Sequence, residues 1–364
     1  MGIHCAAWVG IFLEYKREKR LLANSAPLPP VSVIIPVHNE EFRIKSLLDS
    51  LAKQQYPAAE IIFVENASTD NTIELLRTFA AEHSAGIMVK LITLNENPGP
   101  NHKQYALEKG IEASSGEIFL FTDADCELPP DWIREMTCRF ADPSVGIIIG
   151  PVFKKPGGDS FFHLYQCFDH AIRYLYLVGA TGLGSPGGGF GNNLGIRRKT
   201  LDVVGGYSSV PFSPTEDAAL VARVRTHSTY HIRSVVGKPV FVMTQGESTW
   251  KALINQTLRW NNGGLFGPDL GTRLNFGFLM ITIGLGIIAI PVLAFIPSLW
   301  PLSAAVMTAM AGNTLICLRL FGSALPKKGA AYIVQCIFTP MYFTFLTILG
   351  FCRVKVYWKD SQVS

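Results

Sequence analysis

Four apolar residues lead directly into two carboxylates in the stretch Ile118-Phe119-Leu120-Phe121-Thr122-Asp123-Ala124-Asp125. The apolar run predicts a buried strand over residues 117–122, and the i, i+2 spacing points Asp123 and Asp125 to one side of an extended chain. Two hard oxygen ligands at this spacing suit Mg²⁺ or Mn²⁺. An acidic loop cap is the ordinary alternative, because such a triplet recurs by chance.

Strand and helix patterns alternate upstream of this stretch. The predicted strands cover residues 31–37, 60–64 and 88–94, and the predicted helices cover residues 40–54, 72–81 and 103–113. This alternation predicts an α/β fold with a mostly parallel sheet and helices on both faces. Ligands of such sheets bind at the carboxyl ends of the strands, where the two carboxylates fall. Beyond residue 150 the pattern is less regular, with a Gly-rich loop at 182–191 and helices at 199–204 and 216–226.

The C-terminal part of the chain has a different character. Residues 276–299, 302–321 and 331–351 are apolar segments of about 20 residues, the length that spans a bilayer. The composition agrees, since 48% of the residues are apolar and 16% are charged. Buried core helices are the alternative. A cytosolic domain with three spans places Lys327 and Lys328 inside but Arg353, Lys355 and Lys359 outside. We therefore expect two to three transmembrane helices.

The N-terminus is apolar over residues 3–13 and then basic, without a pattern typical of a signal peptide. Eleven helical residues rise only about 16 Å, which is short of a bilayer core of roughly 30 Å, so the segment is predicted to be an interfacial stub. Residues 23–30 form a Pro-rich linker. The predicted organisation is a stub and linker (1–29), a cytosolic domain (30–265) and a membrane region (266–364).

Charge and cysteine content exclude some classes of function. The net charge of +4 comes without a long basic run, so nothing favours nucleic acid as a partner. The seven cysteines are scattered singly. This spacing favours neither a disulfide framework nor a zinc site, and it suits a reducing cytosol.

Five motifs occur in a distinctive order along the chain. They are Val33-Ile34-Ile35-Pro36-Val37-His38-Asn39-Glu40, Val64-Glu65-Asn66-Ala67-Ser68-Thr69-Asp70, Asp123-Ala124-Asp125 (a DxD triplet), Thr215-Glu216-Asp217, and Gln256-Thr257-Leu258-Arg259-Trp260 (a QxxRW pattern). This order resembles that of family 2 glycosyltransferases. The series is similar to the membrane branch, which includes cellulose, hyaluronan and chitin synthases and glycolipid-forming transferases. The resemblance covers about residues 30–265. It implies a nucleotide-diphospho-sugar transferase fold of the GT-A type, on the cytoplasmic side of an inner or plasma membrane.

The resemblance also implies roles for residues on the donor side. Pro36, Glu40 and Glu65 would hold the nucleotide base and ribose, although the family usually has Asp where this chain has Glu65. Asp123 would contact ribose or metal, and Asp125 would bind the metal that bridges the two phosphates.

Lys103 is a further candidate for the donor side. It could add positive charge near the donor, or it could be a solvated lysine at the start of a helix.

The acidic pair Glu216-Asp217 resembles the one whose Asp is the general base in the family. A carboxylate is needed there because an acceptor hydroxyl has a high pKa and must lose its proton as the new bond forms. The alternative is a helix that Thr215 caps and that carries acids in its first turn.

Gln256, Arg259 and Trp260 lie at i, i+3 and i+4 and share one helical face. A guanidinium can clamp a diphosphate and an indole can stack on a sugar, which is the role that the resemblance implies. The alternative is an amphipathic helix on the membrane surface.

The loop Ser185-Pro186-Gly187-Gly188-Gly189-Phe190-Gly191-Asn192-Asn193 resembles the acceptor-side loop of the family, in which Asn192 or Asn193 would bond sugar hydroxyls. It lacks the Gly-Lys-Ser/Thr ending of a phosphate loop, so an ATPase is not indicated. Some members carry a histidine as a further metal ligand, whereas the corresponding stretch here reads Val242-Met243-Thr244-Gln245.

Together these observations predict an inverting, metal-dependent hexosyltransferase that moves a sugar from a UDP- or GDP-sugar to a lipid or glycan acceptor at a membrane. Two alternatives stay open. One is a processive polysaccharide synthase, and the other is a non-catalytic membrane protein that binds nucleotide sugars.

Overall fold

The structure is a computed structural model, and it describes residues 2–23, 29–56, 59–83, 88–95, 102–211, 213, 215–237, 240–267, 269–293, 295–352, 357–358 and 361–362. The chain forms two compact units. We call residues 14–152 and 189–245 the sheet unit, and residues 1–13, 153–188 and 246–364 the helical unit. Predicted positions at 24–28, 98–101, 353, 355 and 359 lie outside the described residues.

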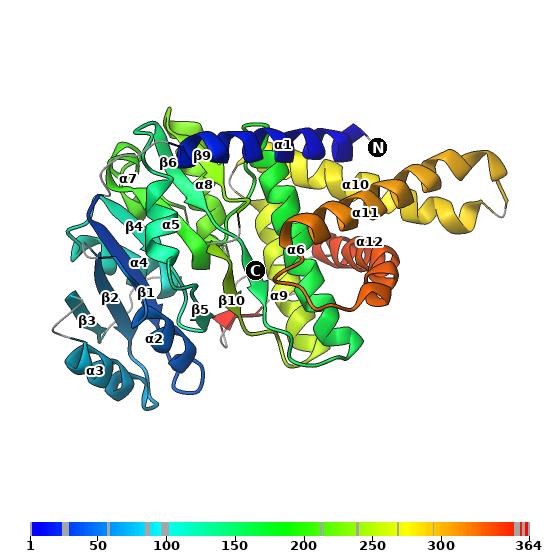
Figure 1. The fold of residues 1–364 in the computed structure, drawn as a ribbon. Coiled ribbons are helices and arrows are strands. Elements are labelled where there is room, and N and C mark those ends of the chain that lie inside the picture. Colours follow the sequence, from blue (N-terminus) through cyan, green and yellow to red (C-terminus); the bar gives the residue numbers. More distant parts are fainter. Residues whose placement is uncertain are drawn as a thin grey trace. The chain divides into compact units, whose positions relative to one another are not determined.

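A seven-stranded sheet forms the centre of the sheet unit (Figure 1). Its strands are β1 (Val31–Val37), β2 (Ala59–Asn66), β3 (Met88–Leu94), β4 (Ile118–Phe121), β6 (Val145–Ile149), β8 (Leu194–Arg197) and β9 (His231–Ser234). Their spatial order is β3-β2-β1-β4-β8-β6-β9, and only β8 runs antiparallel to its neighbours. The predicted α/β fold with a mostly parallel sheet is therefore confirmed.

Helices and short elements complete the sheet unit. They are α2 (Lys45–Leu51), α3 (Thr72–Glu82), α4 (His102–Glu112), α5 (Trp132–Cys138), η1 (Gly191–Asn193), α7 (Arg198–Val203), η2 (Tyr207–Ser209) and α8 (Glu216–His227). A small second sheet has the order β5 (Cys126–Glu127), β10 (Val242–Thr244) and β7 (Val152–Lys154). The helix predicted over residues 40–54 begins only at Lys45, because the chain turns at Asn39 with a positive φ of 53° before it can enter a helix.

Alternating side chains of the central strands bury both faces of the sheet. Val33 and Ile35 of β1 belong to one apolar cluster together with residues of α2, α3 and α5. Ile34, on the opposite face, lies under α4, where a Cβ on Gly110 would come within 2.4 Å of the Ile34 side chain. Glycine at this position lets α4 approach the sheet closely, so helices cover both faces as predicted.

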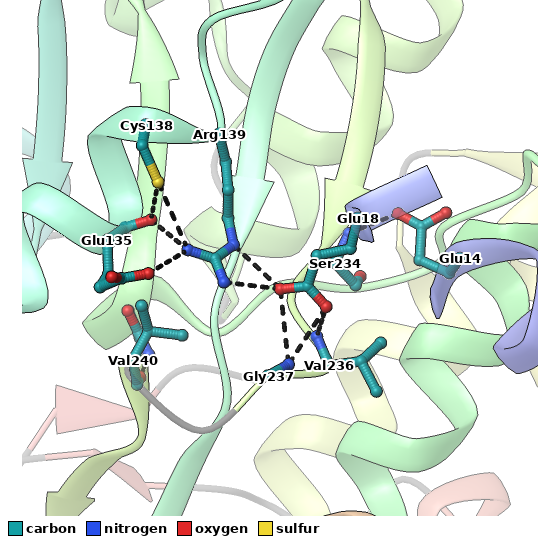
Figure 2. Close-up of polar contacts among 10 residues, drawn as sticks. Glu14, Glu18, Glu135, Cys138, Arg139, Ser234, Val236, Gly237 and Val240 are labelled. Atoms are coloured by element: carbon teal, nitrogen blue, oxygen red, sulfur yellow. Dashed lines mark hydrogen bonds and ion pairs between the residues drawn. The ribbon is translucent and has the colours of Figure 1, made fainter. Parts of the chain in front are cut away.

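Helix α1 (Gly2–Leu22) contributes residues to both units. In the sheet unit, Glu18 accepts hydrogen bonds from Arg139 Nη2 at 2.7 Å and from the Val236 amide at 2.8 Å, as Figure 2 shows. Glu14 accepts one from the Ser234 amide at 2.8 Å. Arg139 is only 1% exposed, so its charge depends on its carboxylate partners Glu18 and Glu135. Two acids therefore tie the second half of α1 to the end of β9.

The helical unit consists mainly of long helices. Its elements, besides the first half of α1, are α6 (Phe161–Gly182), α9 (Trp250–Phe266), α10 (Leu270–Val292), the short η4 (Pro297–Leu299), α11 (Trp300–Phe321) and α12 (Gly329–Phe351), followed by the short strands β11 (Tyr357–Trp358) and β12 (Ser361–Gln362). Three segments, 270–288, 297–321 and 331–350, are long and apolar enough to cross a membrane. The first predicted segment reached residue 299, but α10 ends at Val292 and a short 3₁₀ helix begins at Pro297.

The first half of α1 packs within the helical unit. A Cβ on Gly10 would lie 2.0 Å from the Gly179 carbonyl oxygen, so α1 and α6 are in backbone contact there. Trp8 Nε1 donates to Asn313 Oδ1 of α11 at 2.7 Å. The apolar residues 3–13 are thus half of a 21-residue helix rather than a short stub. Their location at a membrane interface stays a prediction.

The buried carboxylate of Glu60 gives the sheet unit a testable dependence on pH. Burial raises the pKa of Glu60. The Lys90 ammonium at 2.7 Å and hydrogen bonds from Ser32 and Ser115 lower it by a larger amount, so the pKa lies at about 2. Because the pKa of Glu60 is lower in the folded chain than in the unfolded chain, where it is about 4.3, the ionised carboxylate stabilises the fold above about pH 4.3. This contribution is lost as the pH falls toward 2. The unfolding free energy of wild type falls between pH 5 and pH 2.5. We expect this fall to be smaller by about 2 kcal/mol in Glu60→Gln.

Urea unfolding of the detergent-purified chain across this pH range measures the effect. The exposed carboxylate Asp49, which is replaced in Asp49→Asn, serves as the control. Identical pH slopes for wild type and Glu60→Gln would contradict the assignment.

Candidate active site

Asp123 and Asp125 follow the end of β4 and are both half-buried. The carboxyl ends of β1, β2 and β4 meet at this edge because the three strands are parallel. Strand β8 runs the other way and pairs Leu194 with Phe121, which brings η1 to the same edge. The sheet therefore gathers motifs that are far apart in the sequence.

Lys103 connects two of these motifs. Its ammonium lies 2.7 Å from Asp123 Oδ1 and 3.3 Å from Glu216 Oε1, and the side chain is only 17% exposed. Burial lowers the pKa of Lys103, but the carboxylates of Asp123, Glu216 and Asp217 raise it by a larger amount. The pKa of Lys103 therefore lies above its ordinary value. Lys103 is therefore a cation held among carboxylates and not a solvated lysine.

Asp217 lies in the first turn of α8, where two backbone amides orient its carboxylate. Oδ2 accepts from the Gly191 N–H at 2.7 Å, and Oδ1 accepts from the Ala218 N–H at 2.8 Å. A Cβ on Gly189 or Gly191 would come within 3.1 Å of Asp217 Cβ, so glycine lets the loop approach this closely. Thr215 is the N-cap residue but makes no capping side-chain hydrogen bond. The loop, and not a Thr cap, orients the acid.

The residues around Asp125 fit a divalent cation. Asp125 Oδ2 accepts a hydrogen bond from the Thr244 hydroxyl at 2.9 Å, and Thr244 pairs with Cys126 across β10 and β5. Strand β10 thus brings a hydroxyl, and not a histidine, beside Asp125. No group of three His, Cys, Asp or Glu residues that could hold a metal occurs among the described residues. Two carboxylates still suffice for Mg²⁺ when substrate phosphates and water supply the other ligands.

The turns after β1 and β2 are interlocked. Asn39 Oδ1 accepts from the Thr69 amide at 2.8 Å, and the Asn39 amide donates to Ser68 Oγ at 3.0 Å. Asn39 and Ala67 both have a φ of 53°, a conformation that is rare for residues other than glycine and that clusters at functional sites.

The predicted donor residues border these turns. Glu65 is 2% exposed, and its Oε1 accepts from the Ser68 amide at 2.5 Å. Glu40 is 8% exposed and pairs with Arg43 at 2.7 Å, while Pro36 is half-buried in β1. The carboxylate of Glu65 therefore also has a structural task in the turn.

The two asparagines of the Gly-rich loop differ in their surroundings. Asn193 is fully buried, its amide donates to the carbonyls of Pro151 and Val240 at 2.8 Å, and its Oδ1 accepts from Trp132 Nε1 at 2.9 Å. Asn193 is a structural residue. Asn192 is half-buried in η1 and is the remaining candidate of the pair.

Gln256, Arg259 and Trp260 lie on α9, which belongs to the helical unit, and all three are half-buried. The Gln256 amide donates to Glu247 Oε1 at 2.5 Å. The Arg173 guanidinium carbon lies 5.3 Å from the centroid of the Trp260 ring. The sequence analysis missed Arg173 and Thr244, because neither belongs to one of the five motifs.

Comparison with known proteins assigns the family. The profile of "Glycosyl transferase family 2" matches residues 32–217, which is just over half of the chain. The chain belongs to this family. Glycosyltransferase AglE of Haloferax volcanii is 33% identical over 40% of this chain and 46% of its own length. The beta-monoglucosyldiacylglycerol synthase of a Nostoc species is 26% identical over 77% of this chain and 60% of its own length. The chain thus spans about half of these relatives.

One solved structure has a similar fold along almost the whole chain. The mannosyltransferase PcManGT of Pyrobaculum calidifontis, solved with GDP-Man and Mn²⁺, has a TM-score of 0.57 and 21% identity, and the match covers 96% of this chain and 97% of that one. The GT-A fold that the resemblance implied is thereby confirmed for this family 2 glycosyltransferase.

The ion pairs of Lys103 can be tested by stability measurements. Replacing Lys103 with Met leaves the half-buried Asp123 and the buried Glu216 without their cation, so we expect a loss of about 3 kcal/mol of unfolding free energy. The double variant Lys103→Met/Glu216→Gln, which removes one acid as well, should recover part of this loss.

Urea unfolding of the detergent-purified variants measures these changes. Lys45, whose pair with Asp49 is exposed, provides the control Lys45→Met, with an expected change below about 0.5 kcal/mol. Equal effects of Lys103→Met and Lys45→Met would refute the buried pairing.

Proposed function

We propose that this family 2 enzyme is an inverting, metal-dependent glycosyltransferase that moves a hexosyl group from a nucleotide-diphosphate sugar to a lipid or membrane-associated acceptor. The observation that carries the proposal is the contact of Lys103 with Asp123 and Glu216, 2.7 and 3.3 Å away. It joins a carboxylate that follows β4 to the helix turn that bears Asp217, so donor and base residues share one cluster.

The donor would bind along the carboxyl edge of the sheet. The interlocked turns after β1 and β2, with Pro36, Glu40 and Glu65, would receive the base and ribose, and Asp123 would contact the ribose. Lys103 supplies positive charge beside Asp123, where a diphosphate is expected. When an anionic donor enters, it shares this cation with the carboxylates, which lowers the electrostatic cost of placing phosphates near acids.

Asp217 is the proposed general base. Amide hydrogen bonds from Gly191 and Ala218 hold its carboxylate in one orientation, and the residue is half-buried, so an acceptor hydroxyl can reach it. It takes the hydroxyl proton while the acceptor oxygen forms its bond to the anomeric carbon. The bond from that carbon to the diphosphate breaks on the opposite face, so one displacement inverts the configuration. Glu216 stays paired with Lys103 during this step.

Asp123 and Asp125 would hold Mg²⁺ or Mn²⁺, which neutralises the departing diphosphate when bound. Thr244 would orient Asp125 through its hydroxyl. Asn192, Gln256, Arg259 and Trp260 are the proposed acceptor and diphosphate contacts.

Two observations support a membrane acceptor. Three helices among the described residues are long and apolar enough to cross a membrane, and the Nostoc relative is named for synthesis of a glucosyl lipid. We propose that residues 30–265 form a cytoplasmic domain, that residues 266–364 form the membrane region of an inner or plasma membrane protein, and that residues 1–29 lie at the interface. The donor is a UDP- or GDP-sugar. A processive synthase is the second candidate function, and analysis of the product distinguishes it from single transfer.

Release of nucleoside diphosphate tests the base assignment. Detergent-purified wild type is given UDP-glucose, UDP-N-acetylglucosamine or GDP-mannose with phosphatidylglycerol vesicles that contain diacylglycerol or a polyprenyl phosphate. We expect transfer with one of these donors, and Asp217→Asn should lower the turnover about 10²- to 10⁴-fold because the proton acceptor is lost.

Donor binding should survive in Asp217→Asn, and the exposed Asp49→Asn should behave as wild type. One sugar per acceptor is the expected product, whereas a ladder of products indicates the processive alternative. No release from any donor would overturn the proposal in favour of a nucleotide-sugar-binding protein.

Removal of metal tests the carboxylate pair. We expect EDTA to abolish nucleoside diphosphate release and Mg²⁺ or Mn²⁺ to restore it. Asp125→Asn should weaken Mn²⁺-dependent binding of UDP or GDP at least tenfold in calorimetric titrations, because it removes one of two charged ligands. Metal-independent binding that Asp125→Asn leaves unchanged would refute this site.

A further inference from the structure

An ion pair in the helical unit lies directly against Trp260. Arg173 Nε of α6 donates to Asp169 Oδ2 at 2.8 Å, and Asp169 is 1% exposed. Asp169 Oδ1 also accepts from the Tyr165 hydroxyl at 3.3 Å. Even a paired and hydrogen-bonded ion pair contributes little net stability when it is buried, because the cost of desolvating two charges offsets their attraction. Stability alone therefore does not account for this pair.

Two aromatic rings lie against the guanidinium of this pair, and an imidazole ring lies against one of them. The Arg173 guanidinium carbon lies 5.3 Å from the centroid of the Trp260 ring and 4.6 Å from that of Phe343 on α12. The His170 ring lies 5.2 Å from the Trp260 ring at an angle of 74°, an edge-to-face contact. The indole thus has a cation within the distance of a cation–π contact and a second ring beside it, while part of its surface remains exposed.

Further contacts hold the helices that carry these groups. Tyr342 of α12 donates to Thr257 Oγ1 of α9 at 3.4 Å, and the Tyr342 and Tyr165 rings are 5.2 Å apart. Tyr165, Asp169 and Arg173 recur every four residues and therefore share one face of α6. This face contacts both α9 and α12.

We propose that Asp169 and Arg173 are positioning residues that orient the Trp260 ring and thereby set the affinity for the acceptor. Asp169 fixes the guanidinium, the guanidinium and His170 fix the indole, and the exposed part of the ring remains available to stack on a sugar or on the acceptor. Neither Asp169 nor Arg173 touches the reacting atoms. The inference rests on the proposed function of Trp260 at the acceptor.

Two variants separate orientation from simple loss of fold. Arg173→Lys keeps the charge but loses the planar guanidinium, so the contact with the indole weakens. The double variant Asp169→Asn/Arg173→Gln removes both charges and leaves no unpaired ion. Lys328→Gln is the matched control, since it breaks the exposed pair with Asp159 in the same unit.

The first readout is the fluorescence of Trp260. It is obtained by subtracting the emission spectrum of the same protein with Trp260→Phe from the emission spectrum of each protein. We expect Arg173→Lys and the double variant to shift this difference spectrum and to increase its quenching by acrylamide at least twofold. The control should match wild type. Unchanged Trp260 fluorescence in both variants would overturn the positioning role.

The second readout is kinetic and uses the vesicles described above. We expect the acceptor KM to rise about five- to tenfold, while the KM for the nucleotide sugar and its acceptor-independent hydrolysis stay within twofold of wild type. A double-mutant cycle with Trp260→Phe should show that the two effects are not additive. An acceptor KM equal to that of wild type, or additive effects, would overturn the inference while leaving the proposed function intact.

Transfer by wild type is the internal reference. If wild type transfers to none of the vesicles, the proposed function fails and the acceptor part of this inference fails with it. The fluorescence measurement decides independently whether the pair orients the ring.

Discussion

The arrangement of the site depends on one cation among carboxylates. Three acids, Asp123, Glu216 and Asp217, approach one another at the carboxyl edge of the sheet, and their mutual repulsion would be unfavourable without a counter-charge. Lys103 supplies it from the first turn of α4, at 2.7 Å from Asp123. Helix α4 is itself held close to the sheet, because Gly110 lets it approach Ile34. The packing of one helix thus positions the charge that makes the acidic cluster stable.

The parallel strands provide the second constraint. Parallel pairing of β1 with β2 and β4 forces three loops to one edge, and antiparallel β8 adds the Gly-rich loop to it. At two of these loops the backbone adopts a left-handed conformation at Asn39 and Ala67, which costs of order 1 kcal/mol at each residue. Hydrogen bonds between the two turns stabilise this conformation. A preformed edge of this kind can receive a donor with little rearrangement.

The helical unit buries polar side chains between apolar helices. Its long helices are apolar, yet α6 carries a buried ion pair whose guanidinium lies against Trp260 and Phe343. Asn313 of α11 is likewise satisfied by Trp8 and by the Tyr176 hydroxyl at 2.7 Å each. Arg173 contacts rings on α9 and α12, and Asn313 bonds to side chains of α1 and α6. These contacts fix the packing of helices that apolar contacts alone would leave less specified.

The sequence by itself determined strands β1 to β4, most helices of the sheet unit, the three apolar helices and the order of the motifs, but not β6, β8 and β9 of the main sheet. These features follow from local periodicity and from side chains that are neighbours in the chain, such as the two acids after β4. It did not reveal α6, a helix that is buried on most sides and whose apolar residues are interrupted by the buried polar residues Gln166, Asp169 and His170.

The tertiary structure decided which residues become partners. It paired Lys103 with two acids, placed Thr244 beside Asp125, assigned Asn193 to the core and set Arg173 against Trp260. Each of these contacts joins residues far apart in the sequence. Such contacts depend on strand order and helix packing, which no local pattern specifies.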